Sequence, residues 1–252
     1  MPHYDARRYE RQICLPQIGE QGQNKLSKTS VLIVGAGGLG SISSLYLAAA
    51  GIGNITIIDN DDVEITNLNR QILHNEASIG KPKTFSAAQR IKELNSSIKV
   101  YPIQKRLDSD NIRSLIKGIN IIIDATDNYK TRQIINRISI ENKLPWVFGG
   151  VQGFEGMVTS FIPGLTPCFE CIIPRPERSA HTPGIIGPTA GIIASIQAME
   201  AIKLILNIGK SLKNTLLKIS GLDMRIQTLT LSKNPDCPAC SQIKNNRQVN
   251  NI

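Results

Sequence analysis

Short apolar runs and stretches with helical spacing alternate through the first half of the chain. Residues 31–34 form an apolar run that ends in glycines, residues 41–52 continue at helical spacing, and residues 54–59 form a second apolar run that ends in an acid. Apolar runs of this length predict buried strands, and the helical spacing predicts a helix between them. The segment therefore predicts a βαβ unit with two parallel strands.

The same alternation continues to about residue 161. We predict helices at residues 83–94, 110–116 and 130–141, and strands at residues 98–103, within 119–128 and at 145–149. The alternating, glycine-rich segment 151–161 predicts an antiparallel extension of the sheet. The whole pattern predicts an α/β fold with a doubly wound, largely parallel, Rossmann-like sheet.

The remaining segments define the expected domain organisation. Residues 1–30 predict an N-terminal helical arm, residues 31–240 a single domain with cysteine pairs at 168–171 and 237–240, and the polar residues 241–252 a flexible tail. Within the domain, residues 189–206 are apolar on most sides of a helix, which predicts burial in the core or between subunits.

A formal net charge of +9 over 252 residues raises the question of an acidic partner. The Lys and Arg residues are scattered and there is one Trp, so a nucleic-acid-binding module is disfavoured, and an acidic or phosphorylated partner is favoured. No run approaches the ~20 apolar residues of a membrane helix, and the amino end is polar. We expect a cytoplasmic protein that binds neither nucleic acid nor membrane.

A glycine-rich loop, VGAGGLG, joins the first predicted strand to its helix. Gly35, Gly37 and Gly40 have the G-x-G-x-x-G spacing, and Gly38 adds a further glycine. Asp59 ends the next strand, about 20 residues later. Glycines allow close approach to the backbone, helix N–H groups bind phosphate oxygens, and an acid binds ribose hydroxyls. The loop predicts a bound nucleotide, and both a dinucleotide and ATP fit it.

The segment after Asp59 favours ATP. It holds Asn67, Arg70 and Gln71, and Lys83 begins the next predicted helix. A triphosphate attacked at its α-phosphorus needs Arg, Lys and Mg²⁺ to offset developing charge, whereas a nicotinamide site needs little cationic charge beyond the pyrophosphate. We therefore predict that these four residues join an ATP site, and an NAD-dependent dehydrogenase is the weaker alternative.

Two acids follow the third apolar run, in DATDN. Asp127 lies beyond the carboxyl end of that strand, where open sheets place ligands and where a hard oxygen ligand suits Mg²⁺. We predict that Asp127 is the magnesium ligand. Asp124 still lies within the strand, so the sequence supports a cap of a helix or loop and a functional acid equally.

Four of the five cysteines form two Cys-x-x-Cys pairs, Cys168 with Cys171 and Cys237 with Cys240. Two such pairs supply the four thiolates of a tetrahedral zinc site. A redox Cys-x-x-Cys is typically single and precedes a helix, so structural zinc is favoured. Zinc with four sulfur ligands has no open position for catalysis and would tie the carboxyl-terminal segment to the domain. We expect the remaining Cys14 to be a small packing residue.

These motifs together resemble the ThiF/MoeB/HesA family of ubiquitin-activating-type enzymes from about Tyr9 to Cys240. The resemblance rests on RYERQI, VLIVGAGGLG, the D-x-D-x-V-x-x-x-N-L-x-R-Q pattern from Asp59 to Gln71, GKPK, DATDN, SIQAMEAIK and both cysteine pairs. It is strongest to the MoeB and ThiF sulfur-carrier adenylyltransferases. The resemblance implies that ATP adenylates the C-terminal Gly-Gly carboxylate of a small ubiquitin-like sulfur-carrier protein, with release of pyrophosphate.

The resemblance also implies a role for each matching residue. Asp59 would hold the ribose, Arg70 and Lys83 would contact phosphates, and Asp127 would bind Mg²⁺. Arg11 would reach the ATP of the other subunit, which implies a homodimer. The expected catalytic residues are therefore Arg11, Arg70, Lys83 and Asp127.

One position departs from the family. Many relatives carry a cysteine after the first cysteine pair that takes part in thioester or disulfide chemistry, and this chain has Ala180 at the matching place. A methyl group is not a nucleophile, Cys14 lies at the far amino end, and His181 is expected to be an exposed loop residue. We therefore expect adenylation without an enzyme-bound thioester. Adenylation of a peptide or natural-product precursor by the same chemistry is the alternative.

Overall fold

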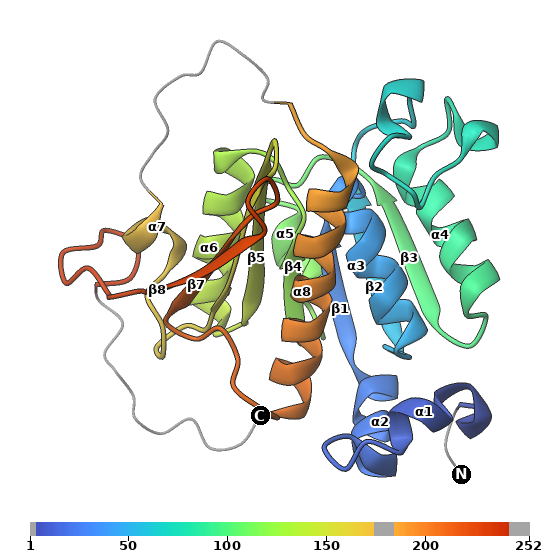
Figure 1. Cartoon of the computed structure of the whole chain (residues 1–252), viewed down its shortest axis with the longest axis horizontal. Coiled ribbons are helices and arrows are strands. Elements are labelled where there is room, and N and C mark those ends of the chain that lie inside the picture. The colour runs from blue at the N-terminus through green and yellow to red at the C-terminus, as the bar shows by residue number, and fades with distance from the viewer. Residues whose placement is uncertain (1–3, 174–183, 242–252) are drawn as a thin grey trace.

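The computed structural model describes residues 4–173 and 184–241, which build an eight-stranded sheet with helices on both sides (Figure 1). The strand order is β3-β2-β1-β4-β5-β6-β7-β8. The parallel part contains β1 (Ser30–Val34), β2 (Asn54–Asp59), β3 (Lys99–Gln104), β4 (Ile121–Asp124) and β5 (Trp146–Gln152). The antiparallel part contains β6 (Glu155–Phe161), β7 (Thr215–Ser220) and β8 (Arg225–Thr230). The predicted doubly wound sheet with an antiparallel extension is confirmed.

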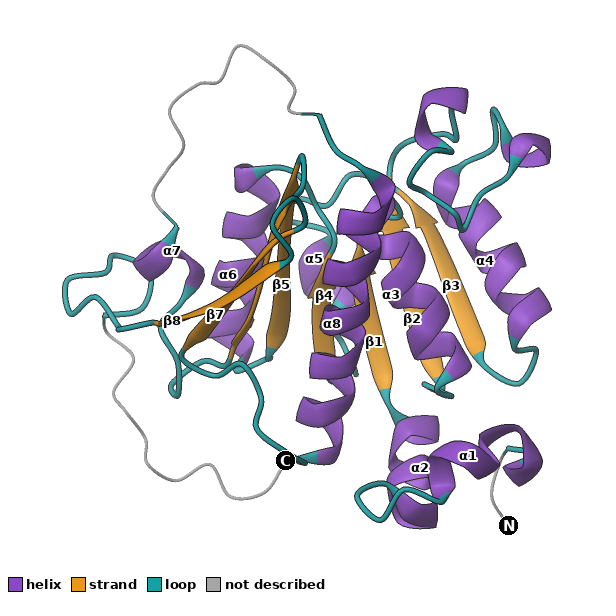
Figure 2. Cartoon of the chain, viewed as in Figure 1, coloured by secondary structure: helices purple, strands orange, loops and turns teal. Residues whose placement is uncertain are grey.

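Two hydrophobic cores lie on opposite faces of the sheet (Figure 2). One core contains residues of α3 (Gly38–Ala49), α4 (Lys83–Leu94) and α8 (Gly187–Leu206). The other contains residues of α5 (Ile112–Leu115), α6 (Tyr129–Asn142) and α7 (Phe169–Ile172). Along β1, Val31 and Ile33 enter the first core while Leu32 and Val34 enter the second, because successive side chains of a strand point to opposite faces. Burial on both faces explains the continuous apolar run.

Helix α8 is the long apolar helix expected from residues 189–206, and it packs on α3 and on the sheet. By length and composition it could cross a membrane, but half of its most apolar window is buried inside the fold. It also carries a buried carboxylate, Glu200, which accepts hydrogen bonds from the Ser160 hydroxyl (3.1 Å) and the Leu212 N–H (2.6 Å). A helix with one buried side is typical of a protein core, and Met199 and Ile192 stay exposed on the outer side of α8.

The first described residues form the short helices η1 (Ala6–Tyr9) and α1 (Glu10–Ile13), followed by α2 (Gly19–Lys28). These helices lie at the amino end of β1, at the opposite end of the sheet from α3's first turn (Figure 1). The Tyr9 hydroxyl accepts a hydrogen bond from the Asn95 side chain (2.8 Å), which anchors η1 beneath α4. Cys14 is exposed here, so the expectation of a packing residue was wrong.

The β7–β8 hairpin was not predicted from the sequence. Its strands are short, and every residue of β8 is exposed, so no strict apolar alternation marks it. Pairing places Ile219 opposite Ile226 and Leu217 opposite Thr228. The hairpin extends the antiparallel part of the sheet and makes β8 an edge strand.

Candidate active site

The glycine loop lies where β1 ends, between β2 and β4. The Gly35 N–H donates to the Ile58 carbonyl (2.9 Å), and the Ala125 N–H donates to the Val34 carbonyl (2.9 Å). Gly35 has a φ of +98°, and a Cβ there would lie 2.6 Å from the Ala125 carbonyl oxygen. A side chain at this position is therefore excluded by backbone geometry and by space. The loop occupies the point of the sheet where open α/β folds bind ligands.

Gly40 allows α3 to start close to the loop, since a Cβ there would lie 2.0 Å from the Gly35 carbonyl oxygen. Gly37 is the residue before α3 and Gly38 is its first residue. Cβ atoms at these two positions would lie 3.6 Å from Gln71 Nε2 and 3.6 Å from Arg70 Cγ, respectively. The structure therefore brings the first turn of α3 against the two predicted polar residues.

Asp59, the last residue of β2, faces the glycine loop. Its Oδ2 accepts from the Ala36 N–H (2.7 Å), and its Oδ1 accepts from the Asp61 N–H (2.9 Å). A carboxylate oxygen has two lone pairs, so each oxygen can accept a further bond from a ribose hydroxyl. The carboxylate lies beside the glycine loop with acceptor capacity to spare, and its ribose role stays a prediction.

The segment between β2 and α4 is closed at its base by Lys83. The Lys83 N–H donates to the Asp61 carbonyl (3.0 Å), and its Nζ lies 2.9 Å from Asp61 Oδ2. The Lys83 side chain is 8% exposed, whereas that of Asp61 is 57% exposed. A cation is thereby held at the first turn of α4, beside the end of β2.

Arg70 lies on the same segment, after the short helix η2 (Ile65–Asn67) and before η3 (Glu76–Ser78). Its Nη1 donates to the Thr66 carbonyl and to Asn69 Oδ1, both at 2.9 Å. The segment packs against the start of α8, because a Cβ on Gly187 would lie 2.6 Å from the Asn69 carbonyl oxygen. The guanidinium is thus held within its own segment, while the aliphatic part of the Arg70 side chain lies against the start of α3.

Asn67 and Gln71 differ in what they do in this segment. Asn67 is buried and its Oδ1 accepts from the Glu64 N–H (3.2 Å), which completes a capping box around η2. Gln71 is 4% exposed, and its Oε1 has no hydrogen-bond partner among the described residues. An unpaired buried oxygen of this kind is costly unless a ligand or water donates to it.

Asp127 is exposed in the loop between β4 and α6, and it accepts from the Asn128 side chain at 3.5 Å. The same loop begins with Ala125, which lies against Gly35. Asp127 is therefore at the carboxyl ends of the strands, where the glycine loop also lies. A single carboxylate that completes its shell with phosphates and waters is a common way to hold Mg²⁺. The residues present therefore fit a magnesium ion shared with a nucleotide.

Asp124 is structural. Its carboxylate is fully buried, pairs with Arg132 Nε (3.1 Å) and accepts from the Thr126 hydroxyl (2.6 Å). Burial raises the pKa of Asp124, and the Arg132 charge opposes that rise. Arg132 Nη2 also donates to the Thr126 (2.6 Å) and Gly149 (3.0 Å) carbonyls, and its guanidinium lies 4.8 Å from the centre of the Phe148 ring. This cluster holds the loop that carries Asp127.

Sequence reasoning missed His74, which is buried between the glycine loop and α4. Its Nε2 lies 3.0 Å from the Ala36 carbonyl oxygen, and its Nδ1 lies 2.9 Å from the Ser86 hydroxyl. Burial lowers the pKa of His74, and the nearby Lys83 charge lowers it further. The available signal was a histidine directly after the apolar pair Ile72 and Leu73, four residues after Arg70.

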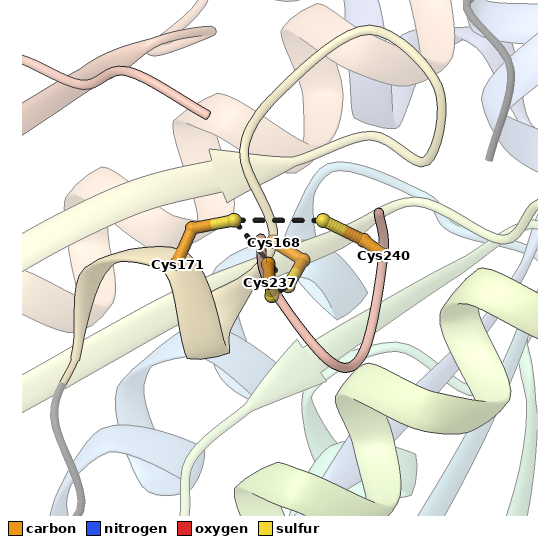
Figure 3. Close-up of side chains that lie close together, drawn as sticks. All are labelled: Cys168, Cys171, Cys237 and Cys240. Atoms are coloured by element: carbon orange, nitrogen blue, oxygen red, sulfur yellow. Dashed lines mark hydrogen bonds between the residues drawn. The ribbon is translucent and has the colours of Figure 1, made fainter. Parts of the chain in front are cut away.

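The four paired cysteines converge from two distant segments (Figure 3). The Sγ atoms of Cys168 and Cys237 are 3.6 Å apart, those of Cys171 and Cys240 are 3.5 Å apart, and all four lie within 4.8 Å of one another. Zinc–sulfur bonds of ~2.3 Å in a tetrahedron place sulfur atoms ~3.8 Å apart. The cluster therefore fits a metal site, and zinc is the ion that four thiolates favour.

Burial raises the pKa of the Cys168 thiol, and it raises that of Cys240 to about 11. Both thiols would hold their protons at neutral pH unless a cation displaced them, and a coordinated metal deprotonates a thiol outright. The site ties the segment after β8 to α7, which is the role expected from four sulfur ligands. Because all four sulfurs are engaged, a metal here would be structural.

The remaining predicted residues lie elsewhere. Arg11 is exposed on α1, at the opposite end of the sheet from the glycine loop of its own chain (Figure 1). Ala180 and His181 lie outside the described residues. The structure therefore brings together Asp59, Arg70 and the glycines but leaves Arg11 apart.

Comparison with known proteins agrees with this geometry. The ThiF family model matches residues 9–239. The SAMP-activating enzyme E1 of Haloferax volcanii is 37% identical over 93% of this chain and 88% of its own length. The sulfur carrier protein adenylyltransferase of Thermus thermophilus is 36% identical over 96% of this chain and 93% of its own length. The adenylyltransferase and sulfurtransferase MOCS3 of Culex quinquefasciatus is 43% identical, and this chain spans 55% of it.

Solved structures also resemble this chain in fold. Escherichia coli MccB, determined with ATP, superimposes with a TM-score of 0.84 at 27% identity, over 93% of this chain and 75% of MccB. The complex of MccB with MccA-N7isoASN reaches a TM-score of 0.85 at 26% identity, over 96% of this chain and 76% of MccB. The matched span, the glycine loop and the cysteine cluster together show that the chain belongs to the ThiF family and is an adenylyltransferase.

Proposed function

We propose that the protein adenylates the C-terminal Gly-Gly carboxylate of a small ubiquitin-like sulfur-carrier protein with ATP. The observation that carries the proposal is the packing of Arg70 against Gly38 at the first turn of α3, with Asp59 at the neighbouring strand end. This arrangement offers N–H groups, a ribose acceptor and a phosphate-binding cation together at the carboxyl ends of β1 and β2. The names of two relatives of matching length, a SAMP-activating enzyme and a sulfur carrier protein adenylyltransferase, support the substrate class.

The reaction needs positioning and charge neutralisation more than proton transfer. One oxygen of the carrier's terminal carboxylate bonds to the α-phosphorus, the bond from that phosphorus to the bridging oxygen breaks, and pyrophosphate leaves with the electron pair. The carboxylate is already ionised, so no general base is required. Arg70 and Lys83 would offset charge on the phosphates. When bound, Mg²⁺ on Asp127 would supply further charge neutralisation.

The dehydrogenase alternative explains fewer of these features. NAD would use the glycine loop and Asp59, but it gives no role to a nearly buried Lys83 held beside them. Tight NAD binding with no ATP binding would favour the dehydrogenase. We infer that the nucleotide is ATP.

We propose that no enzyme thioester follows adenylation. Cys14 is exposed on the arm at the far end of the sheet, and the other four cysteines belong to the metal cluster. By its resemblance to the family, the chain has Ala180 at the place where many relatives carry a cysteine. The acyl-adenylate would therefore be the product released to the next reaction.

The exposed β7–β8 hairpin supports a protein substrate. Leu222, Met224, Ile226 and Leu229 are all exposed, with Met224 at 79%. Exposed apolar side chains gathered on one hairpin commonly mark a binding surface, and an edge strand can pair with a partner's strand. We propose that the carrier's folded body docks on these four residues, which we call the hairpin patch.

Successive backbone contacts connect the β7–β8 hairpin with the segment beside the glycine loop. The Gly221 N–H at the hairpin tip donates to the Phe154 carbonyl (2.8 Å), and the Gly153 N–H donates to the Gly184 carbonyl (2.7 Å). Gly184 leads into α8, whose first residue packs against the Arg70 segment. An extended C-terminal tail that followed these contacts would bring its carboxylate to the nucleotide.

We further propose that residues 31–240 act as one adenylation domain in a homodimer and that residues 1–30 form an arm. Arg11 lies far from its own glycine loop, so it could serve the reaction only in another copy. None of the five cysteines is in a disulfide, which fits a cytoplasmic location.

A peptide precursor is the second candidate substrate. The similarity to MccB supports it, since MccB was solved with MccA and its derivatives and with ATP. This chain covers 75% to 76% of MccB in those two comparisons, so part of that protein has no counterpart here. The hairpin patch favours a folded protein partner.

ATP–pyrophosphate exchange tests the proposal. Exchange should appear with a Gly-Gly carrier, disappear when the two terminal glycines are removed, and remain absent with short peptides of the same C-terminal sequence. Exchange with the peptides alone would support the precursor alternative, and exchange that ignores the carrier would contradict the proposed substrate class.

A further inference from the structure

One buried imidazole, that of His74, is hydrogen-bonded to the glycine loop. His74 is 6% exposed and lies between the loop and α4, with hydrogen bonds to the Ala36 carbonyl and the Ser86 hydroxyl. Ser86 stands one helical turn after Lys83. One side chain therefore joins the loop to the helix that carries the buried cation.

The partners decide which ring nitrogen carries the proton. A backbone carbonyl can only accept, so Nε2 must donate to the Ala36 oxygen. In a neutral imidazole Nδ1 then accepts, and the Ser86 hydroxyl donates to it. Burial lowers the pKa of His74, which keeps this neutral form dominant near pH 7.

This bond sets the direction of a phosphate-binding group. The Ala36 carbonyl and the Gly37 N–H belong to one planar trans peptide, in which the two groups point in opposite directions. Since the carbonyl points into the buried imidazole, the Gly37 N–H points outward, and no described residue accepts from it. The preceding peptide is held as well, because the Ala36 N–H donates to Asp59. Two successive peptide planes of the loop are thus fixed by side chains.

We propose that His74 is a positioning residue for ATP, which holds the Gly37 N–H toward the phosphates and fixes the glycine loop relative to Lys83 on α4. The inference rests on the proposed function, since ATP must be the nucleotide. His74 itself does not touch the reacting atoms. Its effect reaches ATP through the Ala36–Gly37 peptide and through Ser86.

Substitutions at His74 and at Ser86 separate the hydrogen bond to the glycine loop from the hydrogen bond to α4. His74→Gln places an amide near the position of Nε2 and can still donate to the Ala36 carbonyl, whereas His74→Asn places it near Nδ1 and loses that bond. Ser86→Ala removes the α4 contact. Ser139→Ala is the matched control. Like Ser86, Ser139 is a buried serine in a helix, but its hydroxyl donates to the Leu144 carbonyl, away from His74.

The measurement is ATP binding by calorimetry without any carrier, together with the KM values for ATP and carrier in exchange. We expect His74→Asn to weaken ATP binding about tenfold and Ser86→Ala about threefold, the scale of one lost hydrogen bond. We expect His74→Gln to stay within about threefold of the wild type and Ser139→Ala to match it. The KM for the carrier should not change in any variant.

Equal ATP affinity of the Gln and Asn variants would overturn the inference. If His74→Asn does not fold, Ser86→Ala against Ser139→Ala decides the question, and equal binding by those two overturns it. A wild-type protein that fails to bind ATP would instead contradict the proposed function, so the two failures are distinguishable.

Discussion

Lys83 contacts Asp61 in two ways. Its N–H donates to the Asp61 carbonyl oxygen (3.0 Å), and its Nζ forms an ion pair with Asp61 Oδ2 (2.9 Å). The pair closes the segment that carries Arg70 and holds a nearly buried ammonium at the first turn of α4. Because Asp61 is largely exposed, it can stay hydrated when its partner is removed. We therefore expect the ammonium to matter more for charge on a nucleotide than for folding.

We predict that Lys83→Ala lowers the rate of pyrophosphate exchange about 100-fold, the usual cost of removing one group that stabilises developing charge. The free energy of unfolding should change by less than about 1 kcal/mol, since an exposed carboxylate gains little from the pair. Lys81→Ala is the matched control, because Lys81 is an exposed cation two residues away. An unaffected exchange rate in Lys83→Ala would remove Lys83 from the site.

The Asp124–Arg132 pair predicts a stability effect. Arg132→Met should destabilise the protein by about 3–5 kcal/mol, because it leaves a fully buried carboxylate without its partner. Arg137→Met on the same helix should cost less than about 0.5 kcal/mol, since Arg137 is 81% exposed. Urea unfolding measures both values, and similar costs for the two variants would contradict the assignment.

The metal cluster predicts that Cys240→Ser and Cys171→Ser lose stoichiometric zinc and unfold at a lower temperature. Three remaining sulfurs bind zinc more weakly than four, and the site joins two distant chain segments. Cys14→Ser should keep both zinc and exchange activity, since Cys14 is exposed and outside the cluster. Metal analysis measures the zinc content of each variant, and thermal unfolding measures its stability. Full zinc occupancy in Cys240→Ser would contradict the assignment.

The hairpin patch predicts a specific kinetic effect. Ile226→Glu and Met224→Glu should each raise the KM for the carrier about tenfold or more, because a charge is buried at an apolar contact. The KM for ATP should not change. Gln227→Glu adds the same charge on the same exposed strand and should have a smaller effect. If the three variants behave alike, the carrier docks elsewhere.

The sequence predicted the elements that have strong local signals. The glycine loop and Asp59 are marked by strand, turn and helix patterns within one βαβ unit, so their meeting at one sheet edge could be expected. The cysteine pairs were equally clear, because their spacing is itself the signal of a metal site.

The features that were missed depend on contacts between distant residues. Nothing local shows that Asp124 faces Arg132, so the sequence left its role open. His74 binds Ala36 and Ser86, which stand 38 and 12 residues away along the chain. The exposed β8 has no buried face to impose an alternating pattern, so its strand was invisible to periodicity.

The proposed product of this chain is the acyl-adenylate of a carrier protein. The most direct measurement is mass spectrometry of a Gly-Gly carrier after incubation with the protein, ATP and Mg²⁺, with Asp127→Ala as the inactive control. The carrier should gain one AMP at its C-terminal glycine, no mass should be added to the enzyme, and Asp127→Ala should give no adduct. An unmodified carrier with the wild-type protein, or a carrier bound covalently to the enzyme, would contradict the claim.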